Sequence, residues 1–589
     1  GMLAVPAVAA TIVIATPANA AHLADLGQRR VAGPVHIGHH RTMVDAFPYA
    51  VASFEPTASS VLLWTRLDAV AEVSWLVARD PGLGDVVAAG VVSTGPGASS
   101  IVVDVDDLEP ATSYWYRFET AGVHSPVGRT RTLPAGPVER FRLGTVCCAH
   151  YAEAPLGVYR ALAEREVDLV VHLGDYIYEE AGAHGHRRHD PPHEAVTLDD
   201  YRRRLAQVRT DPDTQALHLR HPMVAIWDDH DFCDNAWRDG AKRHDPAQHG
   251  TWPDRVRAAA TARQEWLPIR RRDDADELTT WRSLAIGDVA ELVLLDTRLV
   301  GRDRQAGDDG AKPLDDPNRS LLGDDQRGWL ADRLADGTRP WAIVASGVVV
   351  NELELAWPRP LRWLGRLAPS GYAVLDGRVM HDDQWDGYPA ERDWLVRHLQ
   401  RRAGAGGRTV LLSGDVHSSW AFTGPVDPLA GLPVAVEFTT PAVSSAAMGQ
   451  ARYPGLWRVL DREAHRLDHV VWCDVTNRGY TVVDVTPSAI TSHWWFVHPY
   501  DEDPSAGAEL AAGFRVDRER WPPRLAPTTS PSADPVRPGL PTALPARPGD
   551  LGRLRRRRRT RIVGKAVGLA VGAVVVCGLA VTAVRPGRR

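Results

Sequence analysis

Cysteine is scarce in this chain of 589 residues, which has only five: Cys147, Cys148, Cys233, Cys473 and Cys577. Five cysteines are too few for the disulfide framework of a small secreted domain, and two of them are adjacent, so the thiols do not decide the redox compartment. An excess of positive charge is also missing. The net charge of −6 gives no reason to expect a nucleic-acid partner, and the sequence contains no recognisable nucleic-acid-binding module.

The remaining composition is that of a folded protein, with 44% hydrophobic and 24% charged residues, and the length predicts more than one domain. From 48 to 135, short strand-like runs alternate with clusters of Gly, Pro and Ser, which predicts a small β-sandwich. Leu108-Glu-Pro-Ala-Thr-Ser-Tyr114 resembles the corner of fibronectin type III domains, so we expect a fibronectin type III or Ig-like fold here. This region has no cluster of titratable residues, and we expect it to flank or shade a catalytic cleft.

Residues 140–500 alternate strand-like and helical stretches, as an α/β domain does. The periodicity predicts helices over 155–164, 198–208, 255–266, 323–334 and 391–400, and strands over 290–296, 341–345 and 480–484. The insert 184–193 contains four histidines. We interpret this insert as a solvated loop near the cleft, with a second metal or phosphate site as the alternative.

Four short apolar runs in this region end on side chains that bind metals. Leu169–Leu173 is followed by Gly174, Asp175 and Tyr178, and the other runs end on Cys147 and Cys148, on Asp229 and His230, and on Asp415 and His417. Each run alone also fits a buried strand that ends in a polar turn. Because the carboxyl ends of the strands in an open α/β sheet meet at the edge where ligands bind, the four together predict a metal centre. A phenol beside a carboxylate suits ferric iron.

These motifs resemble, in the same order, those of PhoD-type alkaline phosphatases and phosphodiesterases in the metallophosphatase superfamily, which includes calcineurin-like and purple acid phosphatase-like enzymes. The motifs are GDYIYE at 174–179, WDDHD at 227–231, GDVHSSW at 414–420, DQWDGYP at 383–389 and EFTTP at 437–441. The resemblance extends from Ala50 to Val497. It implies an α/β metallophosphatase sandwich and a metal-dependent phosphoesterase that hydrolyses phosphate monoesters or diesters.

The resemblance also implies roles for individual residues. Asp175 would bridge two metals, with Tyr178, Cys148 and His417 on Fe³⁺, and with Asp229 and Asp415 on a divalent ion, expected to be Ca²⁺. Such a pair would activate a hydroxide for attack on phosphorus. Asp175 and His230 are therefore the expected catalytic residues, with His230 protonating the leaving oxygen. The alternative for His230 is a histidine satisfied within the core.

Three positions depart from the family pattern. Asp229 stands where the wider superfamily has Asn, Ala149-His150 stands where relatives often have a polar amide pair, and Ser346-Gly-Val348 stands where many relatives have an Asn-Gln pair. The core ligand positions are nevertheless all filled. Filled ligand positions favour an enzyme over the alternative function, a membrane-tethered binding protein with an inactive phosphatase fold.

The two ends of the chain predict export and a membrane anchor. Residues 1–22 resemble the core of a signal peptide, although no basic residues precede it, and an uncleaved anchor is the alternative. A Pro-rich linker is expected over 522–550, followed by a basic cluster at 553–561 and an apolar run at 566–584 that is long enough to span a bilayer. The charge rule places the catalytic domain in the cytoplasm, whereas the signal-like segment and the family resemblance favour the outside, which we expect.

Overall fold

The computed structural model describes residues 11–15, 46–94, 99–182, 187–271, 276–353, 372–375, 378–447, 467–498, 500, 507–531 and 533–546. The predicted basic cluster 553–561 and the predicted membrane helix 566–584 lie outside these residues, as does most of the signal-like segment 1–22. Within the described part of the chain, none of the helices has the length and apolarity that crossing a bilayer requires.

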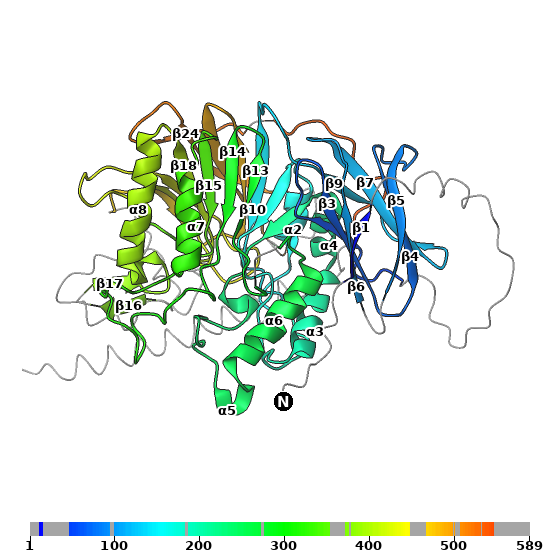
Figure 1. Ribbon diagram of the computed structural model, residues 1–589, viewed down its shortest axis with the longest axis horizontal. Coiled ribbons are helices and arrows are strands. Elements are labelled where there is room, and N and C mark those ends of the chain that lie inside the picture. Colours follow the sequence, from blue (N-terminus) through cyan, green and yellow to red (C-terminus); the bar gives the residue numbers. More distant parts are fainter. Residues whose placement is uncertain are drawn as a thin grey trace, which may run out of the picture.

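Two sheets near the N-terminus form the predicted β-sandwich, drawn in blue in Figure 1. One contains β5 (Val86–Ser93), β4 (Glu72–Ala78), β7 (Ser113–Thr120) and β8 (Val123–His124), with β9 (Gly128–Arg131) paired to β7. It packs on β2 (Val51–Phe54), β3 (Val61–Leu67) and β6 (Ser99–Val105) through a buried apolar core. The Glu109 amide donates a hydrogen bond of 2.8 Å to the Tyr114 hydroxyl, which is the contact of a tyrosine corner.

The sandwich shares a sheet with the domain that follows it. β2 pairs with β3 on one side and in parallel with β12 (Met223–Ala225) on the other. An eleven-stranded sheet therefore runs in the order β1-β6-β3-β2-β12-β11-β10-β22-β23-β24-β25. Its other strands are β1 (Thr11–Ala15), β11 (Leu169–His172), β10 (Phe141–Val146), β22 (Gly479–Val485), β23 (Ala489–Phe496), β24 (Glu509–Asp517) and β25 (Leu525–Pro527). Part of the signal-like segment, β1, thus pairs in parallel with β6.

A second sheet packs face to face with the first. Its seven strands are, in order, β13 (Arg282–Ile286), β14 (Ala290–Leu294), β15 (Trp341–Ala345), β18 (Arg408–Ser413), β20 (Val436–Thr439), β19 (Ser419–Thr423) and β21 (Val470–Asp474). Buried side chains such as Leu143, Val171, Ile343 and Val410 fill the space between the sheets. This apolar layer fixes the distance and orientation of the strand ends that carry the site.

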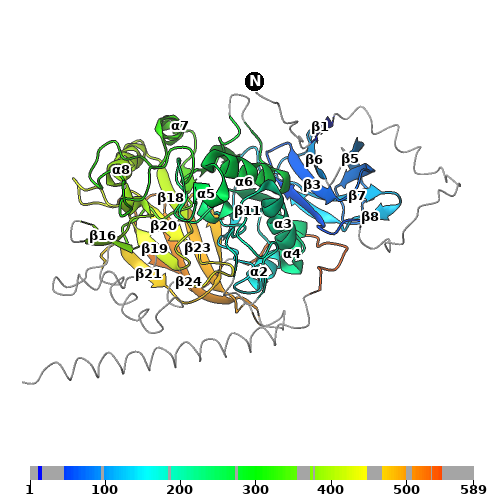
Figure 2. The same ribbon diagram turned by 90° about the horizontal axis from the view of Figure 1, so that it is seen from below.

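Helices cover the outer faces of the two sheets (Figures 1 and 2). The first sheet is covered by α2 (Gly157–Ala163), α3 (Leu198–Arg209), α4 (Pro212–Arg220) and α6 (Trp252–Trp266). The second is covered by α7 (Asp324–Ala335) and α8 (Pro389–Gly404). The short α5 (Pro246–His249) and the hairpin β16 (Tyr372–Leu375) with β17 (Arg378–His381) complete the described elements.

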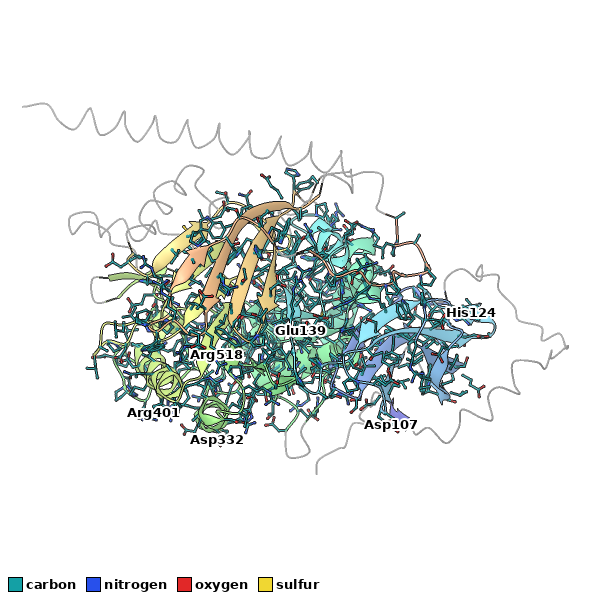
Figure 3. All side chains as sticks on the ribbon, turned by 90° about the horizontal axis from the view of Figure 1, so that it is seen from above. Asp107, His124, Glu139, Asp332, Arg401 and Arg518 are labelled. Atoms are coloured by element: carbon teal, nitrogen blue, oxygen red, sulfur yellow. The ribbon has the colours of Figure 1, made fainter. Side chains whose placement is uncertain are left out.

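The predicted helices and strands of the catalytic region are confirmed, whereas α4 was missed. The β-sandwich and the helices α7 and α8 lie toward opposite ends of the long axis of the molecule (Figure 3). In Figure 3, Asp107 and His124 on the sandwich lie at one end, and Asp332 on α7 and Arg401 on α8 lie at the other.

The segment after Trp521 is docked rather than free, contrary to the predicted linker. We call its described residues 528–531 and 533–546 the C-terminal strap. The Asp534 carboxylate lies 2.5 Å from a guanidinium nitrogen of Arg142, and Arg537 pairs with Asp168. Leu540 packs on the core of the sandwich, and Leu544 packs on the core beneath the helices of the first sheet. These contacts hold the strap across the junction of the two domains.

Candidate active site

Three neighbouring parallel strands of the first sheet and one strand of the second deliver the predicted site residues at their carboxyl ends. Cys148 follows β10, Asp175 follows β11, Asp229 and His230 follow β12, and Asp415 and His417 follow β18. The pairing of β10 with β11 and of β11 with β12 places the first three loops side by side.

Several of these residues have a strained backbone. The φ angles of Cys148, Asp175, Asp415 and His417 are 57°, 56°, 62° and 50°, in the left-handed region that residues other than glycine rarely adopt. Gly174 turns the chain after β11 at φ 106°, and a Cβ atom there would lie 2.4 Å from the Cβ of Asp228. Such strain persists only where the surrounding structure imposes it, and it concentrates at functional sites.

The Asp231 carboxylate ties two of these loops together. One of its oxygens accepts hydrogen bonds from the amides of Asp175 and Asp228, at 3.1 and 3.0 Å, and the other accepts from the amide of Tyr176 at 3.1 Å. The last acidic residue of the WDDHD motif therefore has a structural role, because it fixes the loop after β11 against the loop after β12.

The predicted iron ligands come together as one group. Ligand atoms of Cys148, Asp175 and His417 all lie within 4.8 Å of one another. The Tyr178 hydroxyl joins them, because it lies 2.8 Å from Asp175 Oδ2 and 3.1 Å from His417 Nε2. His417 Nδ1 donates to the carbonyl of Ala446 at 3.1 Å, which leaves the lone pair of Nε2 directed at the group. Burial lowers the pKa of His417 to about 4, so the ring is neutral, as a ligand must be.

A second group shares Asp175 with the first. Ligand atoms of Asp175, Asp229 and His230 lie within 4.8 Å of one another, and so do those of Asp228, Asp229 and Asp415. Asp175 is therefore shared by two of the groups that could hold a metal ion. Burial and the neighbouring carboxylates raise the pKa of Asp175 and of Asp415 well above the ordinary value.

Arg298, which sequence analysis missed, balances part of this negative charge. Its fully buried guanidinium pairs with Asp228, contacts Asp383 and Asp415 at 2.8 Å each, and lies 3.3 Å from Asp229 Oδ1. The second oxygen of Asp415 accepts from the Gln384 amide at 2.5 Å. The extra charge of Asp229, which departs from the Asn of the wider superfamily, thus has a cation beside it.

His230 is held by a second residue that was missed, Glu179. His230 Nδ1 lies 2.8 Å from Glu179 Oε2, and the other oxygen of Glu179 accepts from the Asp234 amide at 2.8 Å. Burial alone would raise the pKa of Glu179, but the His230 charge and these hydrogen bonds lower it to about 2. Burial would lower the pKa of His230, but Glu179 and Asp229 raise it well above the ordinary value. Glu179 therefore favours the protonated form of the His230 ring.

These groups line a cavity of about 690 Å³, and no residue of the β-sandwich is among the lining residues. The sandwich therefore contributes none of the residues that line this cavity, and its role beside the cleft stays a prediction. The lining residues are His150, Glu153, Asp175, Tyr178, Glu180, Asp229, His230, Asp234, Asn235, Lys242, Arg243, His381, Asp383, Asp415, Val416, His417, Ser445 and Ala446.

The Tyr178 ring is stacked between two histidines. His150 lies on one side with ring centroids 4.3 Å apart, and His230 lies on the other at 4.2 Å. His189, from the histidine-rich insert, stacks on His150 at 5.2 Å and is buried. The interpretation of this insert as a solvated loop is wrong for the buried His189, whereas the exposed His193 fits it. Residues 183–186 of the insert lie outside the described part, and the metal-capable groups found in that part do not include His189.

The donor set fits a metal pair. A thiol, a phenol, a neutral imidazole and a carboxylate suit ferric iron, and a carboxylate cluster suits a hard divalent ion such as Ca²⁺. Asp228 Oδ2 and Asp229 Oδ1 are buried, and among the described residues neither accepts a hydrogen bond, although the Arg298 guanidinium lies 3.3 Å from Asp229 Oδ1. Buried carboxylate oxygens without donors are costly unless a cation lies beside them.

The structure thus brings together all the predicted site residues, and it adds Arg298, Glu179, Gln384 and Ser445. The Ser445 hydroxyl donates to the Tyr178 oxygen at 2.7 Å. Glu179 ends the GDYIYE motif, and Arg298 follows a predicted strand, so the rule that found the other loops could have found both. Two further residues stand at positions that depart from the family pattern. His150 lines the cavity. The Ser346 hydroxyl donates a hydrogen bond of 2.6 Å to the carbonyl of Val348.

Fold, site and known relatives together define a metal-dependent phosphoesterase, a hydrolase that acts on phosphoric ester bonds. The family model described as PhoD-like phosphatase matches residues 143–494, and that of the PhoD-like phosphatase N-terminal domain matches residues 34–134. The chain belongs to the PhoD-like phosphatase family.

One curated relative and one solved structure are similar over most of the chain. Alkaline phosphatase D of Bacillus subtilis (strain 168) is 31% identical over 505 residues, which cover 80% of this chain and 81% of that protein. A solved structure of PhoD is 26% identical with a TM-score of 0.69, and the match covers 90% of this chain and all of that one.

Proposed function

We propose that this protein hydrolyses phosphate monoesters or diesters as an alkaline phosphatase of the D type, with Fe³⁺ and a divalent ion, Ca²⁺, at the two groups that share Asp175. When bound, the metals supply the Lewis acidity that activates a water for attack on phosphorus. Cys148, Tyr178 and His417 would hold Fe³⁺, and Asp229 and Asp415 would hold Ca²⁺. The name of the Bacillus subtilis relative supports the activity, and the donor chemistry supports the metals.

The carrying observation is the position of Asp175. This carboxylate belongs to two of the metal-capable groups, the one with Cys148 and His417 and the one with Asp229 and His230. Its backbone amide donates to the Asp231 carboxylate, which holds it in place. A carboxylate that belongs to both groups would hold the two metals close enough to act on one phosphoryl group. Asp228 and Asp383, bound to Arg298, surround the site with fixed charges that do not have to reorganise during the reaction.

His230 is the residue that gives a proton to the leaving oxygen. Its Nδ1 is engaged by Glu179, so Nε2 is the nitrogen that remains for the substrate. Proton donation matters most when the leaving group is an alkoxide, since a good leaving group departs without a proton.

The activity test uses the purified full-length protein and para-nitrophenyl phosphate, with Fe³⁺ and Ca²⁺ supplied. We expect hydrolysis that a chelator abolishes and that the two ions restore, and metal analysis should find iron in the active protein. The variant Asp175→Asn should lose both metals and the activity. Full activity in chelator-treated protein would refute the metal assignment, and inactivity in the presence of every metal set would favour the binding-protein alternative.

We also propose that the catalytic domain works outside the cytoplasm, attached to a membrane through 566–584. The support comes from the sequence alone, from an apolar run of bilayer length that follows the basic cluster 553–561. Protease added to intact cells should digest the catalytic domain. Protection until the cells are lysed would show the opposite orientation, which the charge rule predicts.

A further inference from the structure

The cavity is larger and more acidic than a single phosphate ester requires. Its volume of about 690 Å³ exceeds that of a phosphoryl group several-fold. Its charged wall consists of seven carboxylates and two side chains that carry a permanent positive charge, Lys242 and Arg243. Lys242 and Arg243 are adjacent at one end of a single loop. The position of this loop therefore determines where the outer part of a substrate contacts a positively charged side chain.

The loop from Asp234 to Arg243, whose two ends line the cavity, folds back on itself. The amides and carbonyls of Trp237 and Gly240 bond to each other across it, and the Lys242 amide donates to the Asp234 carbonyl at 3.1 Å. The Asp234 carboxylate in turn lies 4.0 Å from His230 Nε2. The backbone of Lys242 is therefore fixed to Asp234, and Asp234 lies near His230, the proposed proton donor. Because His230 would protonate the leaving oxygen, this part of the cavity is the leaving-group side of the site.

The other cations near the site already have partners. Arg243 contacts Glu180 at 2.9 Å and Asp234 at 3.0 Å, and the buried Arg298 is surrounded by carboxylates. Lys242 differs from them. It is exposed, and within the described ranges no carboxylate lies at ion-pair distance from its ammonium group. An anion that binds Lys242 therefore displaces no existing ion pair.

We propose that Lys242 binds a second anionic group of the substrate, so that the preferred phosphate esters carry another negative charge on the leaving-group side. This inference rests on the proposed function and narrows its substrate class. The lysine side chain is a mobile point charge on a long stem, so it follows anions at somewhat different distances. Asn235, at the other end of the same loop, also lines the cavity and has a neutral amide side chain. Acidic walls elsewhere repel the second charge, which leaves the Lys242 side as the favourable position.

The test compares two substrates that differ by one anionic group, 3-hydroxypropyl phosphate and propane-1,3-diyl bisphosphate, on the full-length protein with its metals. The bisphosphate contains two equivalent phosphates, and this alone raises its kcat/KM. The wild type should prefer the bisphosphate over 3-hydroxypropyl phosphate by more than this statistical advantage. In Lys242→Gln the ratio of the two kcat/KM values should fall about fivefold, as expected for one partly exposed charge pair. Lys242→Arg should keep the ratio. Added salt should reduce the wild-type ratio, because exposed charges are screened.

Arg257→Gln is the matched control, since it removes one positive charge from an exposed position on α6 outside the cavity lining. It should leave the ratio unchanged. A wild-type ratio that the two equivalent phosphates fully explain, or an unchanged ratio in Lys242→Gln, would overturn the inference while leaving the phosphoesterase function intact. If the wild type hydrolyses neither of these monoesters, this inference fails, and hydrolysis of bis(para-nitrophenyl) phosphate then decides whether the proposed phosphoesterase function stands for diesters.

Discussion

The contact between Glu179 and His230 gives the sharpest test of the proposed mechanism. Glu179→Gln keeps the size of the side chain and removes its charge. The two Glu179 oxygens accept from His230 Nδ1 and from the Asp234 amide, each at 2.8 Å. A glutamine has one carbonyl oxygen, so it satisfies one of these donors and turns its own N–H groups toward the other. His230 thereby loses the carboxylate that favours its protonated form.

The size of the effect follows from the strength of the lost interaction. A hydrogen bond between charged groups contributes about 1.5–3 kcal/mol. One pKa unit corresponds to about 1.4 kcal/mol, so the pKa of His230 should fall by about 1–2 units. Because Glu179 raises this pKa and the acid must be protonated to act, removing Glu179 moves the alkaline limb of the kcat profile to lower pH. Above that limb, turnover of an alkyl phosphate should fall about 10- to 100-fold.

The assay is the pH dependence of kcat for an alkyl phosphate and for para-nitrophenyl phosphate, together with metal analysis of each variant. The loss should be smaller for para-nitrophenyl phosphate, whose leaving group needs little protonation. Glu180→Gln is the control, because Glu180 contacts Arg243 at 2.9 Å rather than His230. An unmoved alkaline limb in Glu179→Gln with normal metal content would refute the reasoning, and equal losses on both substrates with metal depletion would show that His230 is a ligand.

Three further predictions concern the metals and the strap. The iron-loaded protein should absorb visible light through the Tyr178 phenolate, and Tyr178→Phe should bleach or shift the band; an unchanged spectrum would remove Tyr178 from the ligand set. Asp229→Ala should lose the divalent ion but keep iron, measured by metal analysis, because Asp229 is absent from the group that contains Cys148. Removing 551–589 should leave a folded, active enzyme. Removing 528–589 should lower the free energy of unfolding by about 2–4 kcal/mol, because Leu540 and Leu544 lose their contacts, whereas equal unfolding curves would show that the strap contributes nothing.

The order of the elements and the positions of the ligands could be predicted because both are encoded locally. A short apolar run followed by Gly174 and Asp175 forms a strand and a turn whatever its neighbours are. Neighbouring parallel strands end at a common edge, so the residues after β10, β11 and β12 had to lie near one another. The loop after β18 belongs to the second sheet, and it joins them only because the two sheets pack face to face.

The contacts that tune the site depend on packing between distant segments. Arg298 follows β14 in the second sheet, and it reaches Asp228 from the first sheet only because the two sheets pack face to face. Periodicity predicts that each sheet has a buried face but does not say which residues meet across it. The same limit applies to Leu540 in the strap, whose apolar contact on the sandwich lies hundreds of residues away in sequence.

The sequence by itself therefore determined the strands, the helices and the set of side chains at the strand ends, because hydrophobic periodicity and turn residues act between near neighbours in the chain. Only the tertiary structure decided that β2 and β12 join the sandwich to the catalytic sheet, that Arg298 neutralises the acids, and that Glu179 holds His230. Each of these is a pairing between segments whose separate patterns are compatible with several partners. The burial of the apolar faces of both sheets selects one of these sets of partners.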